Sequence, residues 1–254
     1  ANYAGSWLTI ILPLCIAQAF NNSDKLFKKN IFRTILVGIF LCIILTNSRN
    51  AWGSAILTIP LIFGIYSIKW FLPILLFISS IILVTTKNIF KGNIQEFFRE
   101  ILPNRIWLEF TNEGFSQLDA TRFEILNAAL RVIINNPFFG TGAASFPVIY
   151  EFETGFWKGH SHNLITELSI SYGLPCTVIL IILIGYILIN SFKVLYIKEK
   201  SKINDKAFFV ASTVFIFSQL VDIQYFDGRI SIVFWLLLAG LKCILDENSL
   251  ISNA

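Results

Sequence analysis

Seven apolar stretches determine what this 254-residue chain can fold into. A helix needs about 20 mostly apolar residues to cross the hydrocarbon core of a bilayer, and seven stretches come near that length. They lie at residues 4–20, 31–46, 53–68, 70–86, 163–190, 207–226 and 230–245. Only 14% of the residues are charged, against about 25% in a soluble domain. We therefore predict an all-α, polytopic helical membrane protein with about seven transmembrane helices, and exclude a disordered chain, a nucleic-acid-binding domain and an ordinary cytosolic enzyme.

Two residue counts add to this picture. The chain has no methionine, even at position 1, so we expect further membrane segments to precede it in a longer protein. The four cysteines all lie inside apolar stretches, where they act as small hydrophobic residues. They indicate neither a disulfide framework nor a metal cluster.

Basic residues mark one side of the membrane. Those in the short loops after the first and fifth segments are Lys25, Lys28, Lys29, Arg33, Lys193, Lys198, Lys200, Lys202 and Lys206. The short loops of the opposite side contain only Arg49 and Arg229. Because basic loops stay in the cytoplasm, we predict a multi-pass protein of the inner (plasma) membrane whose other face is periplasmic.

This alternation of sides divides the chain into three parts. Residues 1–86 are predicted to form four transmembrane helices, 87–162 a large extracytoplasmic loop, and 163–254 three transmembrane helices with a cytoplasmic tail. The loop is far longer than an ordinary connection, and it is predicted to be partly helical. Residues 94–102 have the pattern of a short amphipathic helix, which lies on the membrane surface or packs inside a small outer domain.

A second helix in the loop has clearer signals. Thr121 and Glu124 have the spacing of a capping box. Four residues predict the apolar face of this helix: Phe123, Leu126, Leu130 and Ile133. The sequence Asn-Asn-Pro at 135–137 is expected to end it.

The only histidines, His160 and His162, stand where the loop meets the fifth membrane helix. The positive end of the helix dipole favours a neutral imidazole, which can accept a proton near neutral pH. The alternative is an interfacial histidine that only hydrogen-bonds lipid headgroups or backbone. A His-x-His pair offers two metal ligands, and Glu151 and Glu153 are the only local supplements. We therefore predict no metal site and no cofactor.

Three arginines are candidates for binding an anion. Arg122 falls in the first turn of its helix, where free backbone N–H groups also favour an anion; the alternative is a solvated surface arginine. Arg49 lies in a tight turn on the outer side, so we expect an anionic partner, either a lipid phosphate or a substrate. Arg229 carries the same ambiguity.

Two carboxylates fall inside predicted spans, Glu167 and Asp222. Carboxylates within a membrane are usually functional or paired, although both lie close enough to the outer ends to reach interfacial water. Glu167 follows Asn163 by four residues and could support the corner formed by His162 and Asn163.

Three stretches together resemble the O-antigen ligase and polymerase superfamily, whose members transfer glycans from undecaprenyl diphosphate. Residues 48–53 look like the Ser-Arg turn of that family. Residues 122–142 look like its arginine helix followed by Asn-Pro-x-x-Gly-x-Gly. His162-Asn163, followed after nine residues by Gly173, looks like its His-Asn motif.

The resemblance implies a metal-independent glycosyltransferase of lipopolysaccharide biosynthesis, acting at the outer face of the inner membrane. Its donor would be a glycan on undecaprenyl diphosphate, and its acceptor a lipid or a glycan. The resemblance does not distinguish a ligase from a polymerase, and it does not indicate the oligomeric state. Other expected partners are membrane lipids, and nucleic acid is not expected. The implied catalytic residues are His162, Arg122 and Arg49, and we expect Asn163, Arg229, Glu167 and His160 to bind substrate.

Two other functions compete with this interpretation. The sequences of residues 50–53 and 156–160 are also similar to those of cyanobacterial members of this superfamily that are labelled as bicarbonate transporters. An anion transporter is therefore the second hypothesis. Transporters usually bind their substrates near the middle of the membrane, whereas the candidate residues here gather at one face. The third hypothesis is a non-catalytic membrane scaffold, in which His162 and the arginines lie far apart.

Overall fold

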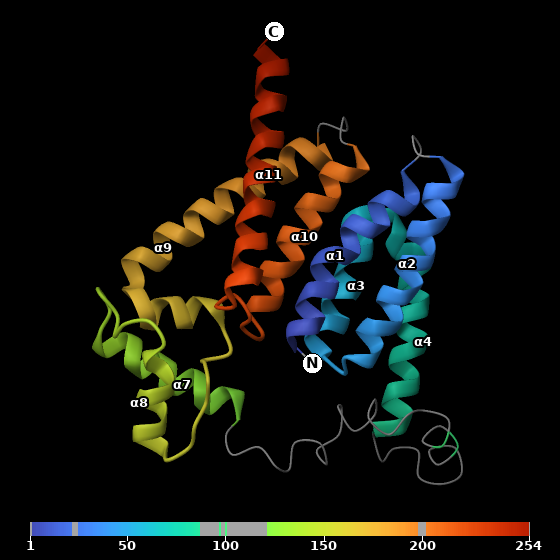
Figure 1. Cartoon of the computed structure of the whole chain (residues 1–254). Helices are drawn as coiled ribbons and strands as arrows, with labels where there is room; N and C mark the ends of the chain where they lie inside the picture. Colours follow the sequence, from blue (N-terminus) through green and yellow to red (C-terminus); the bar gives the residue numbers. More distant parts are fainter. Residues whose placement is uncertain are drawn as a thin grey trace.

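Figure 1 shows the computed structural model of the chain, which describes residues 2–21, 25–86, 121–197 and 202–253, together with Phe97 and Glu100. The N-terminal helices are α1 (Asn2–Phe20), α2 (Leu26–Leu45), α3 (Arg49–Phe63) and α4 (Ile68–Thr86), with a 3-10 turn at Ile65–Ser67. Next come the short helices α7 (Arg122–Asn135) and α8 (Ser145–Thr154). The C-terminal helices are α9 (Leu164–Phe192), which continues as a π-helical turn at Lys193–Ile197, α10 (Ile203–Gln219) and α11 (Gly228–Asn253). The predicted all-α class is confirmed, and a helix lies at each of the seven predicted segments.

Within the described part of the chain, four helical segments are long and apolar enough to cross a membrane: Asn2–Phe20, Ile68–Thr85, Leu164–Ile197 and Gly228–Asn248. The chain is therefore a membrane protein. Among the other helices, α3 and α10 have 15 and 17 residues, and the first half of α2 carries Lys28, Lys29 and Arg33. The count of about seven spans stays a prediction, as does the division into residues 1–86, 87–162 and 163–254.

The core of the bundle forms around α1, which packs against α2, α3 and α10. This helix is apolar on all sides, as expected of a buried helix, and Leu12, Ile16 and Ala19 are almost completely covered. On the other side of α10, Phe215 packs against Phe234 of α11 with ring centroids 5.0 Å apart. Packing therefore fixes α10 between the N-terminal helices and α11.

The helices of the bundle run between two ends (Figure 1). At one end the last turn of α1 meets the first turn of α10, where the amide of Gln18 donates to Asn204 Oδ1 at 3.2 Å. Lys25 and Lys202, the N-cap residues of α2 and α10, lie at this end. At the other end the start of α3 meets the end of α10, where the Asn50 amide donates to the Ser218 carbonyl at 3.0 Å. The histidine segment lies at this second end, where Asn163 contacts Leu220 and His162 contacts Asp222.

The helix that follows the histidines, α9, is broken at Gly173 (Figure 1). With φ 82° and ψ 166°, this residue occupies a region open essentially only to glycine. The loop after α7 binds into the break: Thr141 N donates to Ile170 O and Leu174 N donates to Pro137 O, both at 2.7 Å. These bonds attach α7 and α8 to the first half of α9 and thereby position Arg122 relative to the histidines.

The predictions for α7 are confirmed in part. The capping box of Thr121 and Glu124 is present, and the helix ends at Asn135. The predicted apolar face is wrong in two places, because Phe123 and Leu130 are 69% and 42% exposed. The buried face consists of Ile125, Ala128, Ala129, Val132 and Ile133. This face packs against Phe146 and Tyr150 of α8 and against Ile170 of α9.

Two further predictions need correction or lie outside the structure. The segment 207–226 does not form one continuous helix: α10 ends at Gln219, and a turn follows in which Asp222 N donates to Ser218 O at 3.1 Å. Asp222 therefore lies in a turn rather than inside a membrane helix. The predicted amphipathic helix at residues 94–102 lies outside the described residues, apart from Phe97 and Glu100.

Candidate active site

The start of α9 is fixed by Asn163, its N-cap residue. The side-chain oxygen of Asn163 accepts from Ile165 N at 2.9 Å and from Thr166 N at 3.3 Å. Its amide nitrogen donates to Leu220 O at 2.9 Å. Asn163 thus joins the start of α9 to the turn after α10, and both polar atoms of its side chain are engaged in this structural role.

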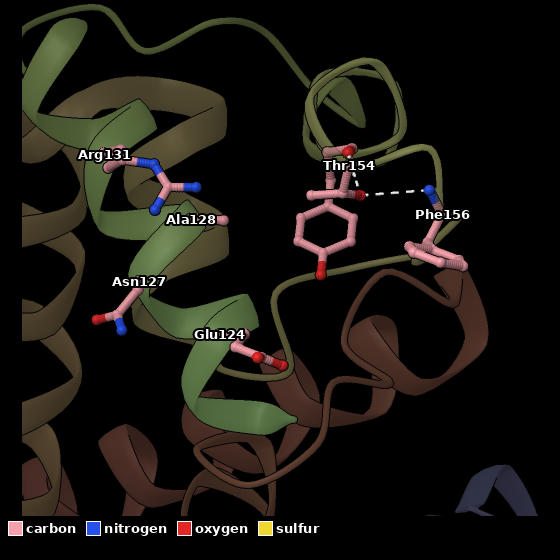
Figure 2. A pocket seen from close by; sticks show the side chains of 7 residues that line it. Glu124, Asn127, Ala128, Arg131, Thr154 and Phe156 are labelled. Atoms are coloured by element: carbon pink, nitrogen blue, oxygen red, sulfur yellow. Dashed lines mark hydrogen bonds between the residues drawn. The ribbon is translucent and has the colours of Figure 1, made fainter. Parts of the chain in front are cut away.

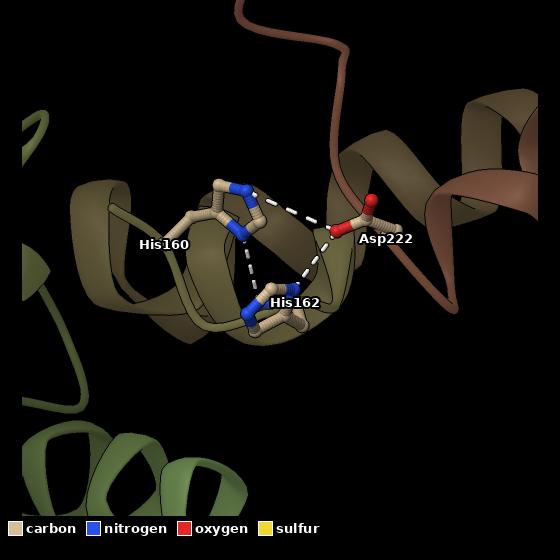
Figure 3. A group of neighbouring side chains, drawn as sticks. All are labelled: His160, His162 and Asp222. Carbon is tan, nitrogen blue, oxygen red and sulfur yellow. Dashed lines mark hydrogen bonds and ion pairs between the residues drawn. The ribbon is translucent and has the colours of Figure 1, made fainter. Parts of the chain in front are cut away.

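His162 immediately precedes this cap and has a left-handed backbone conformation, with φ 58°, which is uncommon for a residue other than glycine. Its imidazole faces the turn after α10, where His162 Nδ1 lies 2.8 Å from Asp222 Oδ1. His160 Nε2 lies 3.9 Å from the same oxygen. Figure 3 shows the two rings on one side of the Asp222 carboxylate, with ring centroids 4.4 Å apart.

Hydrogen bonding assigns the tautomers of both histidines. His162 N donates to His160 Nδ1 at 3.2 Å, so this nitrogen is an acceptor and the proton of a neutral His160 is on Nε2. Because a carboxylate only accepts, His162 Nδ1 must donate to Asp222. In neutral His162 the free lone pair is consequently on Nε2, which makes that atom the available base.

The charge states of His160 and Asp222 agree with this assignment. Burial lowers the pKa of His160, and the nearby His162 and Arg122 lower it further, against the opposing effect of Asp222. Burial alone would raise the pKa of Asp222. The hydrogen bond from His162 and the positive groups around it outweigh burial, and the pKa of Asp222 is lowered. The cluster therefore combines an ionised carboxylate with a neutral His160 at neutral pH.

A second set of hydrogen bonds fixes the Asp222 carboxylate. Its other oxygen, Oδ2, accepts from the side-chain amide of Asn2 and, at 3.0 Å, from that of Gln224. Gln224 in turn accepts from Ser6 Oγ at 2.9 Å. The buried Gln219 side chain accepts from Gln224 N at 2.7 Å and from Tyr225 N at 2.9 Å. This network holds the carboxylate in one orientation.

Arg122, the first residue of α7, lies beside this cluster. One of its guanidinium N–H groups donates to the carbonyl of Val221, the neighbour of Asp222. The side chain is exposed, and a guanidinium has five N–H donors, so further donors remain for an anion. The structure brings Arg122 and the two histidines together around one turn.

The other two arginines lie in different settings. Arg49 is the exposed first residue of α3. The N-cap residue beside it, Ser48, donates to Asn2 Oδ1 at 3.0 Å, and Asn2 donates to Asp222, so α3 begins next to the cluster. Arg229 donates to both oxygens of Asp227, at 3.1 and 2.8 Å, and is 80% exposed. These bonds lower the pKa of Asp227 to about 2, and the charge of Arg229 is already matched by this carboxylate.

Glu167 contributes to the histidine segment from within α9. It is buried, and its carboxylate accepts from Ser161 N at 2.8 Å. Ser161 Oγ also lies 2.8 Å from Thr166 Oγ1. Glu167 therefore fixes the backbone between the two histidines, rather than contacting their rings.

The sequence marks Asp222 as an unusual carboxylate within a predicted span, but it does not indicate that Asp222 belongs to the site. Its partner histidine is 60 residues away, and no local pattern indicates that pairing. Asn2 and Gln224 were missed altogether, because isolated amides carry no signal in a sequence. Asp222 also adds a third potential metal ligand to the His-x-His pair, since atoms of His160, His162 and Asp222 lie within 4.8 Å of one another.

The hydrogen bonds favour a proton-transfer site over a metal site here. To bind a cation through Nε2, His160 would have to move its proton to Nδ1. That nitrogen already accepts from His162 N, so two N–H groups would then face each other. The three side chains fit a carboxylate that orients the imidazole of His162, while the backbone N–H of His162 orients the imidazole of His160.

Comparison with known proteins identifies one family. The family model described as O-antigen ligase matches residues 34–181, more than half of the chain. The matched residues include α3, α7 and the histidine segment, but not the turn that carries Asp222. No curated protein and no solved structure matches the chain.

Proposed function

Because this chain belongs to the O-antigen ligase family, we propose that it transfers a glycan from undecaprenyl diphosphate to an acceptor hydroxyl, with His162 as the general base. The observation that carries this proposal is the 2.8 Å hydrogen bond from His162 Nδ1 to Asp222, which leaves Nε2 able to accept a proton. Asp222 acts as a positioning residue: it selects the tautomer of His162 and stabilises the imidazolium that forms.

The reaction is a single displacement at the anomeric carbon. His162 Nε2 takes the proton of the acceptor hydroxyl as the hydroxyl oxygen attacks that carbon. The bond between the carbon and the phosphate oxygen breaks, and its electron pair leaves with the diphosphate. Configuration at the sugar carbon is inverted, and no general acid is needed because diphosphate is a good leaving group.

Arg122 and Arg49 neutralise the diphosphate. Charge develops on its oxygens as the bond breaks, and donors fixed beside that position lower the barrier. The position of Arg122 next to the Asp222 turn supports this role, as does the start of α3 beside Asn2. With charge neutralised by arginine, the reaction needs no metal ion. Asn163, Glu167 and His160 position the base, and Arg229 contributes to the rim of the site.

We place the site at the periplasmic face. The support is the arrangement of the bundle, in which Lys25 and Lys202 lie at the end with the Gln18–Asn204 contact, and the histidines lie at the other end, beside the turn after α10. Since basic loops remain in the cytoplasm, the site faces outward, where a carrier lipid presents its glycan.

We further propose a ligase, which transfers the glycan to a different molecule, rather than a polymerase. Profiling glycans and lipid-linked intermediates in a strain lacking the gene tests this choice. Loss of a ligase leaves full-length glycan on the carrier lipid and removes it from the acceptor. Loss of a polymerase leaves single units on the carrier, and a glycan profile identical to the parent strain contradicts both.

A further inference from the structure

A pocket between α7 and α8 lies outside the proposed reaction centre. It has a volume of about 350 Å³, within the range of ligand sites. Figure 2 shows Glu124, Asn127 and Arg131 along α7 on one side, with Thr154 and Phe156 on the other. The α7 residues follow the i, i+3, i+7 spacing of one helical face, so a polar stripe of α7 forms one wall.

The chemistry of the walls fits a sugar. The pocket offers a carboxylate, an amide and a hydroxyl beside the ring of Phe156, which is 48% exposed. Arg131 is paired with Glu153 at 3.3 Å, so the pocket has no excess positive charge that would select a phosphate. Donors and acceptors next to an aromatic face suit a pyranose, which has hydroxyl groups around its rim and C–H groups on its face.

Both walls are fixed before any ligand binds. Glu124 Oε2 accepts from Thr121 N at 2.7 Å and from Thr121 Oγ1 at 3.0 Å, which leaves Oε1 for a ligand. Thr154 Oγ1 donates to Tyr150 O at 2.7 Å and accepts from Phe156 N at 3.3 Å. Such preorganisation reduces the entropy lost on binding.

The pocket is connected to the proposed reaction centre by both of its walls. Glu124 lies two residues after Arg122 in the first turn of α7. Phe156 precedes His160 by four residues. A glycan whose first sugar is held between Arg122 and His162 would therefore extend along these walls.

We propose that this pocket binds a pyranose unit of the glycan, beyond the sugar that reacts. The inference rests on the proposed function, because that function supplies the glycan. The unit belongs to the donor or to the acceptor, and separate KM measurements for the two substrates distinguish these sources.

The experiment uses the full chain in lipid vesicles with two pairs of variants. Phe156→Ala is compared with Phe152→Ala, which removes a ring that is 93% exposed and does not line the pocket. Asn127→Ala is compared with Asn135→Ala, which changes an exposed amide on the same helix. We expect each pocket variant to raise KM for one glycan substrate about 3- to 10-fold, as for the loss of one hydrogen bond or ring contact, with kcat within about 2-fold.

A direct binding measurement separates this proposal from the proposed function. The probe is the oligosaccharide released by mild acid from the lipid-linked glycan of the source cells, and its binding is followed by saturation-transfer NMR. Weaker binding in Phe156→Ala and Asn127→Ala, but not in the two controls, supports the pocket even if no transfer is detected. If transfer proceeds while pocket and control variants have the same KM and bind the probe equally, the pocket proposal is wrong and the proposed function is unaffected.

Discussion

Gly140 and Gly173 lie against each other, and neither position has room for a side chain. A Cβ on Gly140 would lie 2.8 Å from Gly173 N, and a Cβ on Gly173 would lie 2.1 Å from Phe138 O. Gly140, in the loop after α7, and Gly173, in α9, thus contribute to the same contact. They allow the loop after α7 to enter the break in α9, which sets the position of Arg122 relative to His162.

Gly173→Ala is expected to lower both stability and transfer. The left-handed backbone of Gly173 alone would cost an alanine about 1–3 kcal/mol, and the clash with Phe138 adds to this. Thermal unfolding in vesicles measures the effect. The control is Gly185→Ala in the same helix, which has open space around it and is expected to leave the protein equally or more stable. Equal unfolding temperatures for Gly173→Ala and the wild type would contradict the proposed role of the break.

Asp222→Asn is expected to reduce kcat about 100-fold or more, with a smaller change in KM. An amide can donate to His162 Nδ1 and so favour the tautomer whose proton is on Nε2, which removes the base; the loss of a base typically costs about 10²- to 10⁴-fold. Initial rates of transfer measure the change. Asp246→Asn, which alters an exposed carboxylate paired with Lys242, is the matched control. Activity within a few-fold of the wild type would exclude Asp222 as a positioning residue.

Arg122→Ala is expected to reduce transfer about 10²- to 10³-fold, the usual effect of removing a donor that stabilises developing charge. Arg122→Lys should recover part of the rate, because lysine restores the charge but not the planar set of donors. Arg33→Ala, at the other end of the bundle, is the control and should transfer normally. The interpretation fails if Arg122→Ala and Arg33→Ala have the same rate.

Removal of divalent cations is expected to leave transfer unchanged. In the proposed mechanism arginines neutralise the leaving diphosphate, and the His160 tautomer opposes coordination. The measurement compares initial rates in vesicles treated with EDTA and then supplied with Mg²⁺, Mn²⁺ or Zn²⁺. A loss of activity that one of these ions restores would show that a metal takes part.

Local signals allowed correct predictions from the sequence. The helices follow from apolar stretches of about 20 residues, because a helix satisfies its backbone hydrogen bonds within one segment in lipid. The capping box of α7 and its end at Asn135 are encoded within a few residues. The predicted apolar face of α7 is only partly correct, since the side chains that cover it come from α8 and from Ile170 of α9, and no spacing within α7 indicates them.

The composition of the site was less predictable for the same reason. His162 and Arg122 carried local signals, but the partner of His162 comes from a turn after α10 that was expected to be helical. Only the fold of the chain brings Asp222, Asn2 and Gln224 to the histidines. Their roles depend on contacts between residues that are far apart in the sequence, and the sequence alone does not indicate these contacts.

The most direct test of the central claim is the rate of glycan transfer by His162→Ala and His162→Gln in vesicles that contain purified protein and the lipid-linked donor. The account predicts that both variants bind the donor like the wild type and transfer it at least about 100-fold more slowly. Transfer at the wild-type rate by either variant would contradict the assignment of His162 as the base.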